Sequence, residues 1–425
     1  MEFILAGQRP APQIEYRDQT LYSEDVALAD IARREGTPAY VYSRASILEK
    51  FRAYEDAFGD VPHRVCYAVK ANANLAILKL LAEAGAGFDI VSGGELFRTL
   101  KAGADPAGVI FSGVGKTAQE LDYALEHGIR SFNCESEPEL ALLDSLAARR
   151  GVQARVALRV NPDVDAVTHP YISTGLRKHK FGIDIGDAEG VYERAKAFRN
   201  LILEGVSCHI GSQILDITPM LEVFDKMVAL VECLRRMGLP IRSLDLGGGL
   251  GVPYKPDEAA PDISDYVRAM CERVQGHNLE ILIEPGRSIV AEAGVLLTRV
   301  LYRKTNGDRQ FVIVDAAMND LIRPALYHSH HEIIPLRQNQ GGTITADVVG
   351  PVCETGDFLA RGREIANVMP GDLLAICTAG AYGFVAASNY NARPRAPEIL
   401  VEGGKYRVVR KRESLEDLIR GEIDA

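Results

Sequence analysis

A lysine stands at the end of a short apolar run in the first part of the chain, where its amine could do chemistry. The run 64–69 is rich in β-branched and aromatic residues, which predicts a buried strand ending at Lys70. Asn72 and Asn74 then offer turn and capping chemistry before a helical pattern at 75–81. Because a buried ammonium is costly, Lys70 either reaches water or forms a Schiff base with a carbonyl compound, for which pyridoxal phosphate is the obvious partner.

A glycine cluster and an acidic motif follow two later strand-like runs. Residues 245–251 read Asp-Leu-Gly-Gly-Gly-Leu-Gly. The backbone N–H groups of a glycine-rich loop can approach an anion closely, although a flexible turn has a similar composition. The cluster lacks the Lys-Ser/Thr of a Walker loop. The motif Glu-Pro-Gly-Arg at 284–287 ends the last run. Glu284 and Arg287 either pair with each other or contact a pyridine nitrogen and a substrate carboxylate, respectively.

Other polar residues beside the strand-like runs have both a structural and a functional explanation. His209 is either structural or catalytic, and Ser212 next to it suggests a second anion contact. Asp89 either orients the lysine or caps the next helix. Cys353 is consistent with a small buried hydrophobe, and Glu354 with a solvated acidic turn. The remaining candidates, which could equally be ordinary surface or core residues, are Arg323, Tyr327 and Tyr382.

Composition limits the classes of protein. The chain has 425 residues with 47% hydrophobic and 25% charged content, so it can build a large core and two or three domains. A net charge of -10 argues against nonspecific binding to nucleic acid or to an anionic membrane. We find no signal peptide and no apolar run that could span a bilayer. Seven scattered cysteines without a Cys-x-x-Cys pair indicate reduced thiols in the cytoplasm and no zinc site.

A β-then-α rhythm begins near residue 44. Eight such units predict parallel strands and match a (β/α)8 barrel, whose sites lie at the carboxyl ends of the strands; a doubly wound open sheet is the alternative. A glycine follows most helical runs, which suits C-capping. The strand-like runs are 65–70, 87–92, 108–113, 131–135, 154–161, 203–210, 243–247 and 279–284, and the helical runs between them are 75–84, 94–102, 118–126, 138–149, 187–198, 219–237 and 264–275.

The rhythm changes after residue 285. Strand-like runs at 294–301, 311–314, 343–349, 373–377 and 406–409 follow with little helical periodicity, which predicts a second, all-β domain. We therefore expect a barrel over 44–286 and a C-terminal β domain over 287–425. The segment 1–43 contains a strand-like run at 39–42 that could join the β domain.

Six motifs in order resemble the fold-type III pyridoxal-phosphate decarboxylases, and among them the diaminopimelate decarboxylase family. They are Tyr-Ala-Val-Lys-Ala-Asn at 67–72, His-Ile-Gly-Ser at 209–212, Gly-Gly-Gly-Leu-Gly at 247–251, Glu-Pro-Gly-Arg at 284–287, Cys-Glu-Thr-Gly-Asp at 353–357 and Ala-Tyr-Gly at 381–383. The resemblance covers nearly the whole chain, including Thr174-Gly175, 180–182 and 390–395. Thr355 stands where serine is more usual, a mild departure.

The resemblance implies a carboxy-lyase that converts meso-2,6-diaminopimelate to L-lysine and CO2, the last step of lysine biosynthesis. It implies a homodimer with shared sites and pyridoxal 5'-phosphate as cofactor, with no metal. Lys70, His209 and the proton donor Cys353 are the implied catalytic residues. The implied cofactor ligands are Lys70, Asp89, His209, Ser212, Gly247, Gly248, Gly249, Gly251, Glu284, Gly286, Arg287 and Tyr382. The implied substrate ligands are Arg287, Arg323, Tyr327, Glu354 and Tyr382.

Other functions are weighed against this one. One alternative is a sister decarboxylase acting on ornithine, arginine, carboxynorspermidine or a carrier-bound amino acid. A substrate that ends in an amine alone needs acids at its distal end, whereas two arginines suit a carboxylate. A racemase suits an arginine at the pyridine nitrogen, where this chain has Glu284. A non-catalytic pyridoxal-phosphate carrier has no need of the β domain. The stretch 168–180, rich in His, Lys, Ser and Gly, is long enough to be a lid that excludes water.

Overall fold

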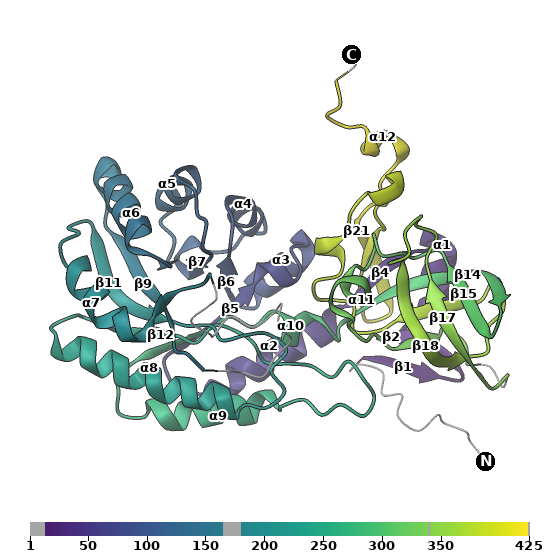
Figure 1. Ribbon diagram of the computed structural model, residues 1–425, viewed down its shortest axis with the longest axis horizontal. Coiled ribbons are helices and arrows are strands. Elements are labelled where there is room, and N and C mark those ends of the chain that lie inside the picture. Colours follow the sequence, from purple (N-terminus) through teal and green to yellow (C-terminus); the bar gives the residue numbers. More distant parts are fainter. Residues whose placement is uncertain (1–12, 165–179, 339–340, 424–425) are drawn as a thin grey trace. The chain divides into compact units, whose positions relative to one another are not determined.

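The structure is a computed structural model that describes residues 13–164, 180–338 and 341–423 (Figure 1). Its chain divides into two compact units, which we describe separately. The barrel unit consists of Lys50–Val252 and Ala260–Ser288. The β unit consists of Met1–Glu49, Pro253–Ala259 and Ile289–Ala425.

Eight parallel strands form a closed barrel in the barrel unit. They pair in the order β9-β11-β12-β13-β5-β6-β7-β8, and β8 also pairs with β9, which closes the sheet and excludes the open alternative. The predicted barrel is therefore confirmed. The strands are β5 (His63–Ala68), β6 (Gly87–Ile90), β7 (Val109–Phe111), β8 (Ser131–Cys134), β9 (Ala154–Asn161), β11 (Leu201–Ser207), β12 (Ser243–Asp245) and β13 (Glu280–Ile283); a two-residue strand, β10 (Ile183–Asp184), pairs with β9.

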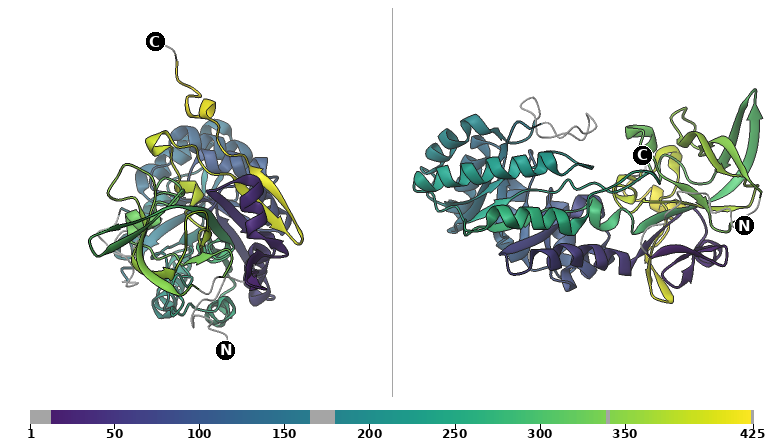
Figure 2. Two further views of the ribbon diagram at one scale, coloured as in Figure 1. Left: turned by 90° about the vertical axis from the view of Figure 1, so that its right-hand side faces the viewer. Right: turned by 90° about the horizontal axis from the view of Figure 1, so that it is seen from below.

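Helices surround these strands, as Figures 1 and 2 show from three directions. Gly128 and Gly151 end α5 and α6 with φ of 62° and 69°, a left-handed conformation that confirms the predicted glycine caps. No helix in the described part of the chain has the length and apolar character needed to cross a membrane. The helices are α3 (Leu75–Glu83), α4 (Gly93–Lys101), α5 (Ala118–His127), α6 (Glu137–Arg150), α7 (Ile185–Ala195), α8 (Thr218–Arg236), α9 (Ile263–Val274) and the short α10 (Arg287–Val290).

Helix α2 (Arg44–Phe58) precedes the first barrel strand and is missing from the sequence-based expectations. Ile47, Phe51, Tyr54 and Phe58 are all buried, and their spacing of three and four residues places them on one helical face. The pattern for this helix was therefore present in the sequence.

The β unit is built on a mixed, twisted sheet with the strand order β18-β17-β15-β14-β4-β20-β21. Strand β4, from the N-terminal part of the chain, pairs antiparallel with β14 and parallel with β20. The strands are β4 (Ala39–Ser43), β14 (Gly294–Asn306), β15 (Arg309–Val314), β16 (Ile333–Pro335), β17 (Thr343–Val349), β18 (Phe358–Ala366), β19 (Leu373–Ile376), β20 (Glu398–Glu402) and β21 (Lys405–Arg410). A small sheet of β1 (Ile14–Arg17), β2 (Thr20–Ser23) and β3 (Val26–Ala27), with helices α1 (Leu28–Glu35), α11 (Arg323–Tyr327) and α12 (Leu415–Leu418), completes the unit.

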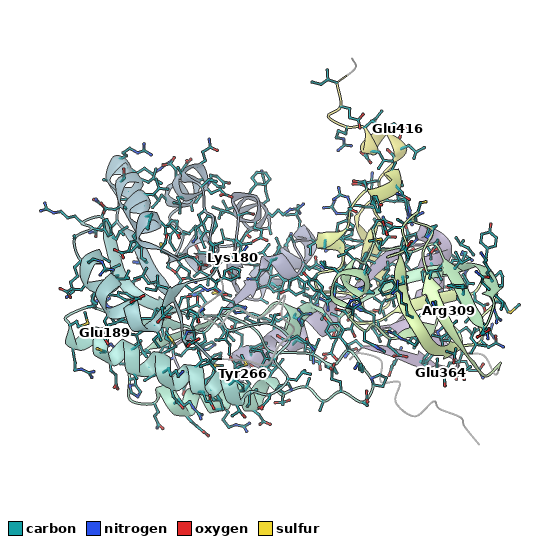
Figure 3. All side chains as sticks on the ribbon, viewed as in Figure 1. Lys180, Glu189, Tyr266, Arg309, Glu364 and Glu416 are labelled. Atoms are coloured by element: carbon teal, nitrogen blue, oxygen red, sulfur yellow. The ribbon has the colours of Figure 1, made fainter. Side chains whose placement is uncertain are left out.

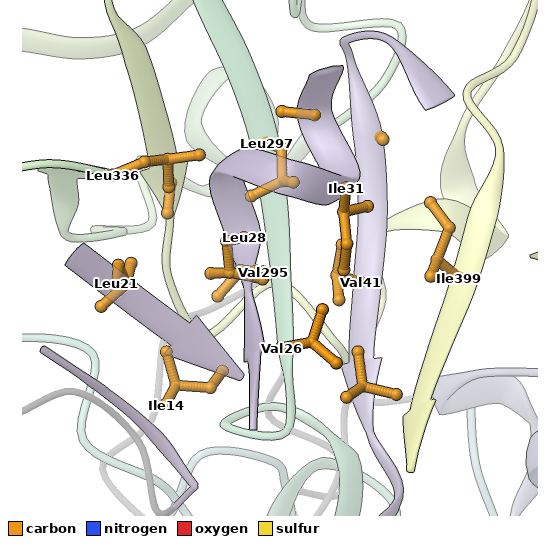
Figure 4. Close-up of a cluster of buried hydrophobic side chains, with 14 of the residues drawn as sticks. Ile14, Leu21, Val26, Leu28, Ile31, Val41, Val295, Leu297, Leu336 and Ile399 are labelled. Atoms are coloured by element: carbon orange, nitrogen blue, oxygen red, sulfur yellow. The ribbon is translucent and has the colours of Figure 1, made fainter. Parts of the chain in front are cut away.

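A cluster of buried aliphatic side chains joins the two sheets of the β unit (Figure 4). It brings Leu28 and Ile31 of α1 against Val295 and Leu297 of β14 and Val41 of β4. Burying one such side chain stabilises the fold by about 1.5–3 kcal/mol, so this cluster fixes the N-terminal segment to the C-terminal strands.

The strands β16, β18 and β20 have no counterpart among the predicted runs. Strand β18 is interrupted in sequence by Arg361, Gly362 and Arg363, and its pairing with β17 shifts register beside these residues. The pairing partner, more than the residue types, holds this strand together.

Asp320 is a buried carboxyl group of the β unit whose charge should couple the stability of the protein to pH. It accepts the Ala317 amide at 2.9 Å, and burial raises its pKa to about 7. The carboxyl group of Asp320 has a lower pKa in the unfolded chain than in the folded protein. Its contribution to the free energy of unfolding is therefore full below about pH 4 and is lost as the pH rises through 7.

We expect the free energy of unfolding of Asp320→Asn, relative to wild type, to rise by a few kcal/mol between pH 5 and pH 8. Urea denaturation at both pH values measures this difference. The control is Asp308→Asn, at an exposed turn. Equal pH slopes for wild type and Asp320→Asn would contradict the raised pKa.

Candidate active site

The candidate lysine lies in a turn directly beyond strand β5. Sequence reasoning placed Lys70 at the strand end, but β5 stops at Ala68, and Lys70 occupies a 3-10 turn, Val69–Ala71. The prediction of the strand boundary is therefore wrong by two residues, because the turn closes before the apolar run has ended. The Lys70 side chain is 36% exposed, so the turn carries its amine out of the strand.

The amine of Lys70 is paired with a fully buried carboxylate. Its Nζ donates to Oδ2 of Asp89 on β6 at 2.5 Å. The other oxygen, Oδ1, is buried and has no hydrogen-bond partner among the described residues. The next helix is capped by Ser92, whose Oγ accepts the Glu95 amide. Of the two explanations for Asp89, the structure therefore favours orientation of the lysine.

The asparagines after the lysine hold the backbone of its turn. Oδ1 of Asn72 accepts the Asn74 amide at 3.1 Å, and Oδ1 of Asn74 accepts the Ala76 amide at 2.9 Å and so caps α3. The Tyr67 hydroxyl donates to the carbonyl of Asn72 at 3.0 Å. The turn and cap chemistry read from the sequence is confirmed.

Glu284 lies in a buried polar cluster that sequence reasoning did not find. The Ser112 hydroxyl donates to its Oε1 at 3.1 Å, and the Asn133 amide is 3.3 Å from the same oxygen. Nδ2 of Asn133 also donates to Oδ2 of Asp245 at 2.7 Å. Ser112 follows β7, Asn133 is the last residue but one of β8, and Asp245 ends β12, so each is a polar residue near the carboxyl end of a barrel strand.

Burial raises the pKa of two carboxyl groups in this cluster. Desolvation, with the nearby carboxylates Asp245 and Asp89, raises the pKa of Glu284 well above its ordinary value. Desolvation likewise raises the pKa of Asp245 to about 6. Both carboxyl groups are therefore easier to protonate in the folded protein than in water, and the largest effect falls on Glu284 or is shared with Asp245 beside it.

The glycines of residues 247–251 are required by close backbone approaches. A Cβ at Gly248 would lie 2.3 Å from the carbonyl oxygen of Glu284, and one at Gly249 would lie 2.7 Å from that of Gly211. Gly249 also has φ of 121°, which a side chain would strain. The loop is thus bound tightly to the loops that follow β11 and β13.

His209 sits against the same glycine loop. Its Nδ1 accepts the Gly248 amide at 3.2 Å, so in the neutral ring Nε2 carries the proton. Desolvation lowers the pKa of His209 well below its usual value, and the cations Arg159 and Lys70 lower it further. The imidazole is therefore neutral, as a ring stacked on a cofactor or a structural histidine would be.

Arg287, Ser212 and Gly286 complete the set in the barrel unit. Nη2 of Arg287 donates to Oγ of Ser212 at 3.0 Å, which links the loops after β13 and β11. A Cβ at Gly286 would lie 2.9 Å from Cβ of Ala71, so a glycine here lets the Glu284 loop pack against the lysine turn. The Ala68 amide donates to the Pro285 carbonyl at 3.1 Å between the same two segments.

A second ion pair in the barrel was also missed. Arg159 on β9 donates to Oε1 of Glu135 at 3.0 Å, and Oε2 of Glu135 accepts the Gly182 amide at 2.6 Å. The Arg159 guanidinium lies 4.6 Å from the centroid of the Phe181 ring. Of the predicted lid, residues 168–179 lie outside the described residues; its last residue, Lys180, is labelled in Figure 3.

In the β unit, the candidate arginine is buried at the start of a short helix. Arg323 begins α11 and its guanidinium lies 4.9 Å from the ring centroid of Tyr254. Its Nη2 donates to Oγ of Ser329 at 3.3 Å. Tyr327 ends the same helix and is half-buried, so α11 carries two candidate substrate ligands.

Cys353 and Glu354 lie in the exposed turn between β17 and β18. Asp357 fixes the turn, because its two carboxylate oxygens accept the amides of Met318 and Val352, each at 2.7 Å. The Cys353 amide donates to Oδ1 of Asn391 at 2.7 Å. Cys353 is exposed, so the buried-hydrophobe explanation fails; Glu354 is exposed, as expected for an acidic turn.

Tyr382 adopts a left-handed conformation, with φ of 56°, between two closely packed glycines. A Cβ at Gly380 would lie 1.9 Å from the Val290 carbonyl oxygen, and one at Gly383 would lie 2.8 Å from the Tyr40 hydroxyl. Strain at a residue other than glycine costs about 1–3 kcal/mol and is typical of functional sites.

The predicted residues thus fall into two sets. The barrel unit gathers Asp89 on strand β6 and, beyond its strand ends, Lys70, His209, Ser212, the four loop glycines, Glu284, Gly286 and Arg287. The β unit holds Arg323, Tyr327, Cys353, Glu354 and Tyr382.

The barrel set fits pyridoxal phosphate. Lys70 offers a Schiff-base amine beside Asp89, whose second oxygen has no hydrogen-bond partner within the described residues. Glu284 offers a carboxyl group, with a pKa raised by burial, for a pyridine nitrogen. The Ser212 hydroxyl and the glycine loop lie after β11 and β12, which suits an anion at the carboxyl end of the barrel.

Comparison with known proteins agrees with this chemistry. A family model described as "Pyridoxal-dependent decarboxylase, pyridoxal binding domain" matches residues 44–291. The diaminopimelate decarboxylase of Pseudomonas aeruginosa is 56% identical over 407 residues, covering 96% of this chain and 98% of the relative. That of Vibrio cholerae is 53% identical over 402 residues, covering 94% and 96%, respectively.

Solved structures are similar over the same extent. The crystal structure of diaminopimelate decarboxylase from Helicobacter pylori complexed with L-lysine has a TM-score of 0.89 at 44% identity, covering 92% of this chain and 98% of that one. The M. jannaschii enzyme in co-complex with L-lysine has a TM-score of 0.93 at 37% identity, covering 98% of each.

Proposed function

Because the chain belongs to the diaminopimelate decarboxylase family of pyridoxal-dependent decarboxylases, we propose that it decarboxylates meso-2,6-diaminopimelate to L-lysine and CO2. The observation that carries this proposal is the pairing of Lys70 with buried Asp89 in the same barrel that holds Glu284, a carboxyl group whose pKa is raised by burial. When bound, pyridoxal phosphate supplies the electron sink for the pair that decarboxylation leaves on Cα.

We assign the cofactor ligands as follows. Lys70 would provide the amine that binds the cofactor, and Asp89 would hold that amine in place. Glu284 would share a proton with the ring nitrogen and so keep the ring electron-poor, while Ser112, Asn133 and Asp245 hold the carboxyl group of Glu284. The neutral His209 would pack on the ring. The phosphate is bound by Ser212, Gly286, Arg287 and the loop glycines Gly247, Gly248, Gly249 and Gly251, with Tyr382 as a further contact.

The distal end of the substrate carries a carboxylate and an ammonium on one carbon. We assign the carboxylate to the guanidinium groups of Arg287 and Arg323, with the Tyr327 hydroxyl as a further donor. Glu354 takes the ammonium, and Tyr382 contacts the substrate as well. Sγ of Cys353 delivers the proton to Cα after CO2 has left, a role that its exposed position permits.

We further propose that the enzyme is a cytoplasmic homodimer, in which residues 44–286 bind the cofactor and residues 287–425 carry substrate and dimer contacts. Cys353 and Glu354 of one chain then complete the site of the other. The exposed turn that carries both residues supports this arrangement, because it leaves them free to meet a partner chain.

A panel assay tests the reaction. CO2 release from meso-, LL- and DD-diaminopimelate, ornithine, arginine and lysine should be large for the meso isomer alone. Release from ornithine or arginine at a comparable rate would favour the sister decarboxylases.

Subunit mixing tests the shared sites. Lys70→Ala and Cys353→Ala are each expected to be inactive. After random exchange about half of the dimers are mixed, and each mixed dimer has one site with both residues intact, so about a quarter of wild-type activity should return. If Lys70 and Cys353 of a site came from the same chain, every site would lack one of them, and verified exchange would restore nothing.

A further inference from the structure

The guanidinium of Arg323 is held by a buried histidine of the β unit. Nε of Arg323 lies 3.3 Å from Nε2 of His331, and Nδ1 of His331 lies 2.9 Å from the carbonyl oxygen of Cys377. The carbonyl can only accept, so Nδ1 carries the ring proton. Nε2 then has a free lone pair and accepts from the arginine, which donates at every nitrogen.

The environment of His331 keeps the ring neutral. The side chain of His331 has no exposed surface, and the backbone carbonyl oxygen of the same residue accepts a hydrogen bond from Arg363. Burial, together with the adjacent Arg323, lowers the pKa of His331 to about 3. The ring of Tyr254 packs at 77° to the imidazole, with 5.3 Å between centroids.

A neutral hydrogen-bond acceptor orients the guanidinium of Arg323 without adding a negative charge, unlike a carboxylate. An aspartate or glutamate at this position would fix the guanidinium but would also pair with its charge. An imidazole fixes the orientation of the guanidinium and adds no negative charge beside it. Ser329 adds a second uncharged acceptor at Nη2, and Tyr254 offers an aromatic face.

We propose that His331 is a positioning residue that orients Arg323 toward the distal carboxylate of the substrate and thereby sets specificity. This inference rests on the proposed function, in which Arg323 binds that carboxylate. Ligands that carry the carboxylate should depend on His331, and ligands that lack it should not.

A pair of ligands tests the selectivity directly. L-lysine retains the distal amino-acid group of the substrate, whereas 1,5-diaminopentane is lysine without its carboxylate. Their dissociation constants for the holoenzyme are measured by calorimetry. In His331→Leu we expect lysine to bind roughly 10- to 100-fold more weakly, because one bond that orients a charged group is lost, and diaminopentane to change less than about 2-fold.

The kinetic constants supply a second readout. For meso-diaminopimelate, KM should rise in His331→Leu by a similar factor while kcat changes little. His331→Gln keeps an uncharged acceptor and should recover most of the lysine affinity. The matched control is His330→Leu: His330 is the neighbouring histidine, partly exposed and 3.1 Å from Glu332, and its loss should leave both ligands unaffected.

The outcomes distinguish a failure of the positioning role of His331 from a failure of the proposed function on which it rests. If His331→Leu weakens both ligands equally, or neither, the positioning role is wrong. If His331→Leu does not fold, His331→Phe keeps the ring outline without either nitrogen and is expected to show the same selective loss. Arg323→Ala should lower the preference for lysine over diaminopentane at least as much as His331→Leu does. If Arg323→Ala leaves that preference unchanged, the assignment of the distal carboxylate to Arg323 fails instead.

Discussion

Meso-2,6-diaminopimelate should be decarboxylated with a kcat/KM at least roughly 10⁴-fold above that for L-lysine or L-ornithine. The reacting ends of these amino acids are alike, so the difference arises at the distal end. When lysine or ornithine binds with its one carboxylate at the reacting end, it brings only an amine to the distal end, and Arg287 and Arg323 would then be desolvated without a substrate carboxylate. Both side chains are buried, with 7% and 5% exposure, so water cannot easily replace the missing group.

Arg323→Ala should lose most of the turnover of meso-diaminopimelate while it still binds the cofactor, because Arg323 is assigned to substrate alone. CO2 release measures the turnover, and the absorbance of the bound cofactor measures loading. Arg309→Ala, at an exposed arginine of the β unit labelled in Figure 3, is the control for the removal of a positive charge. Comparable turnover of ornithine by the wild type would overturn the distal-carboxylate assignment.

Lys70→Ala should lower kcat by at least roughly 10³-fold, since the residue that carries the cofactor acts as a unit with the rest of the site. Borohydride reduction of the wild-type holoenzyme, followed by peptide mapping, should place the label on Lys70. We expect the label on Lys70 because its amine is paired with the fully buried carboxylate of Asp89.

Lys116 provides an internal contrast for the labelling experiment. Its amine is buried in the same unit and already donates to the carbonyls of Gly113 and Asn133 and to Glu139, at 2.6–2.8 Å. All three of its donors are used, so it should remain unlabelled. A label on Lys116, Lys178 or Lys180 in place of Lys70 would refute the assignment.

The sequence predicted the barrel because hydrophobic periodicity and glycine caps are local. Each strand and helix is encoded by its own residues, and the count of eight units then limits the fold. The turn of Asn72 and Asn74 was predictable for the same reason, since each side chain bonds backbone two residues away. The strand β18 was missed because its middle is charged and only its partner β17 holds it in the sheet.

The sequence by itself also determined which residues could do chemistry: a lysine after a buried strand, a glycine cluster and an acid after later strands. Only the tertiary structure decided which of them meet. Closure of the barrel by β8 and β9 brings Ser112, Asn133 and Asp245 from three strands around Glu284, and folding of the β unit brings His331 to Arg323. Such contacts, and the pKa shifts that burial causes, depend on distances between residues far apart in the chain, which local pattern does not contain.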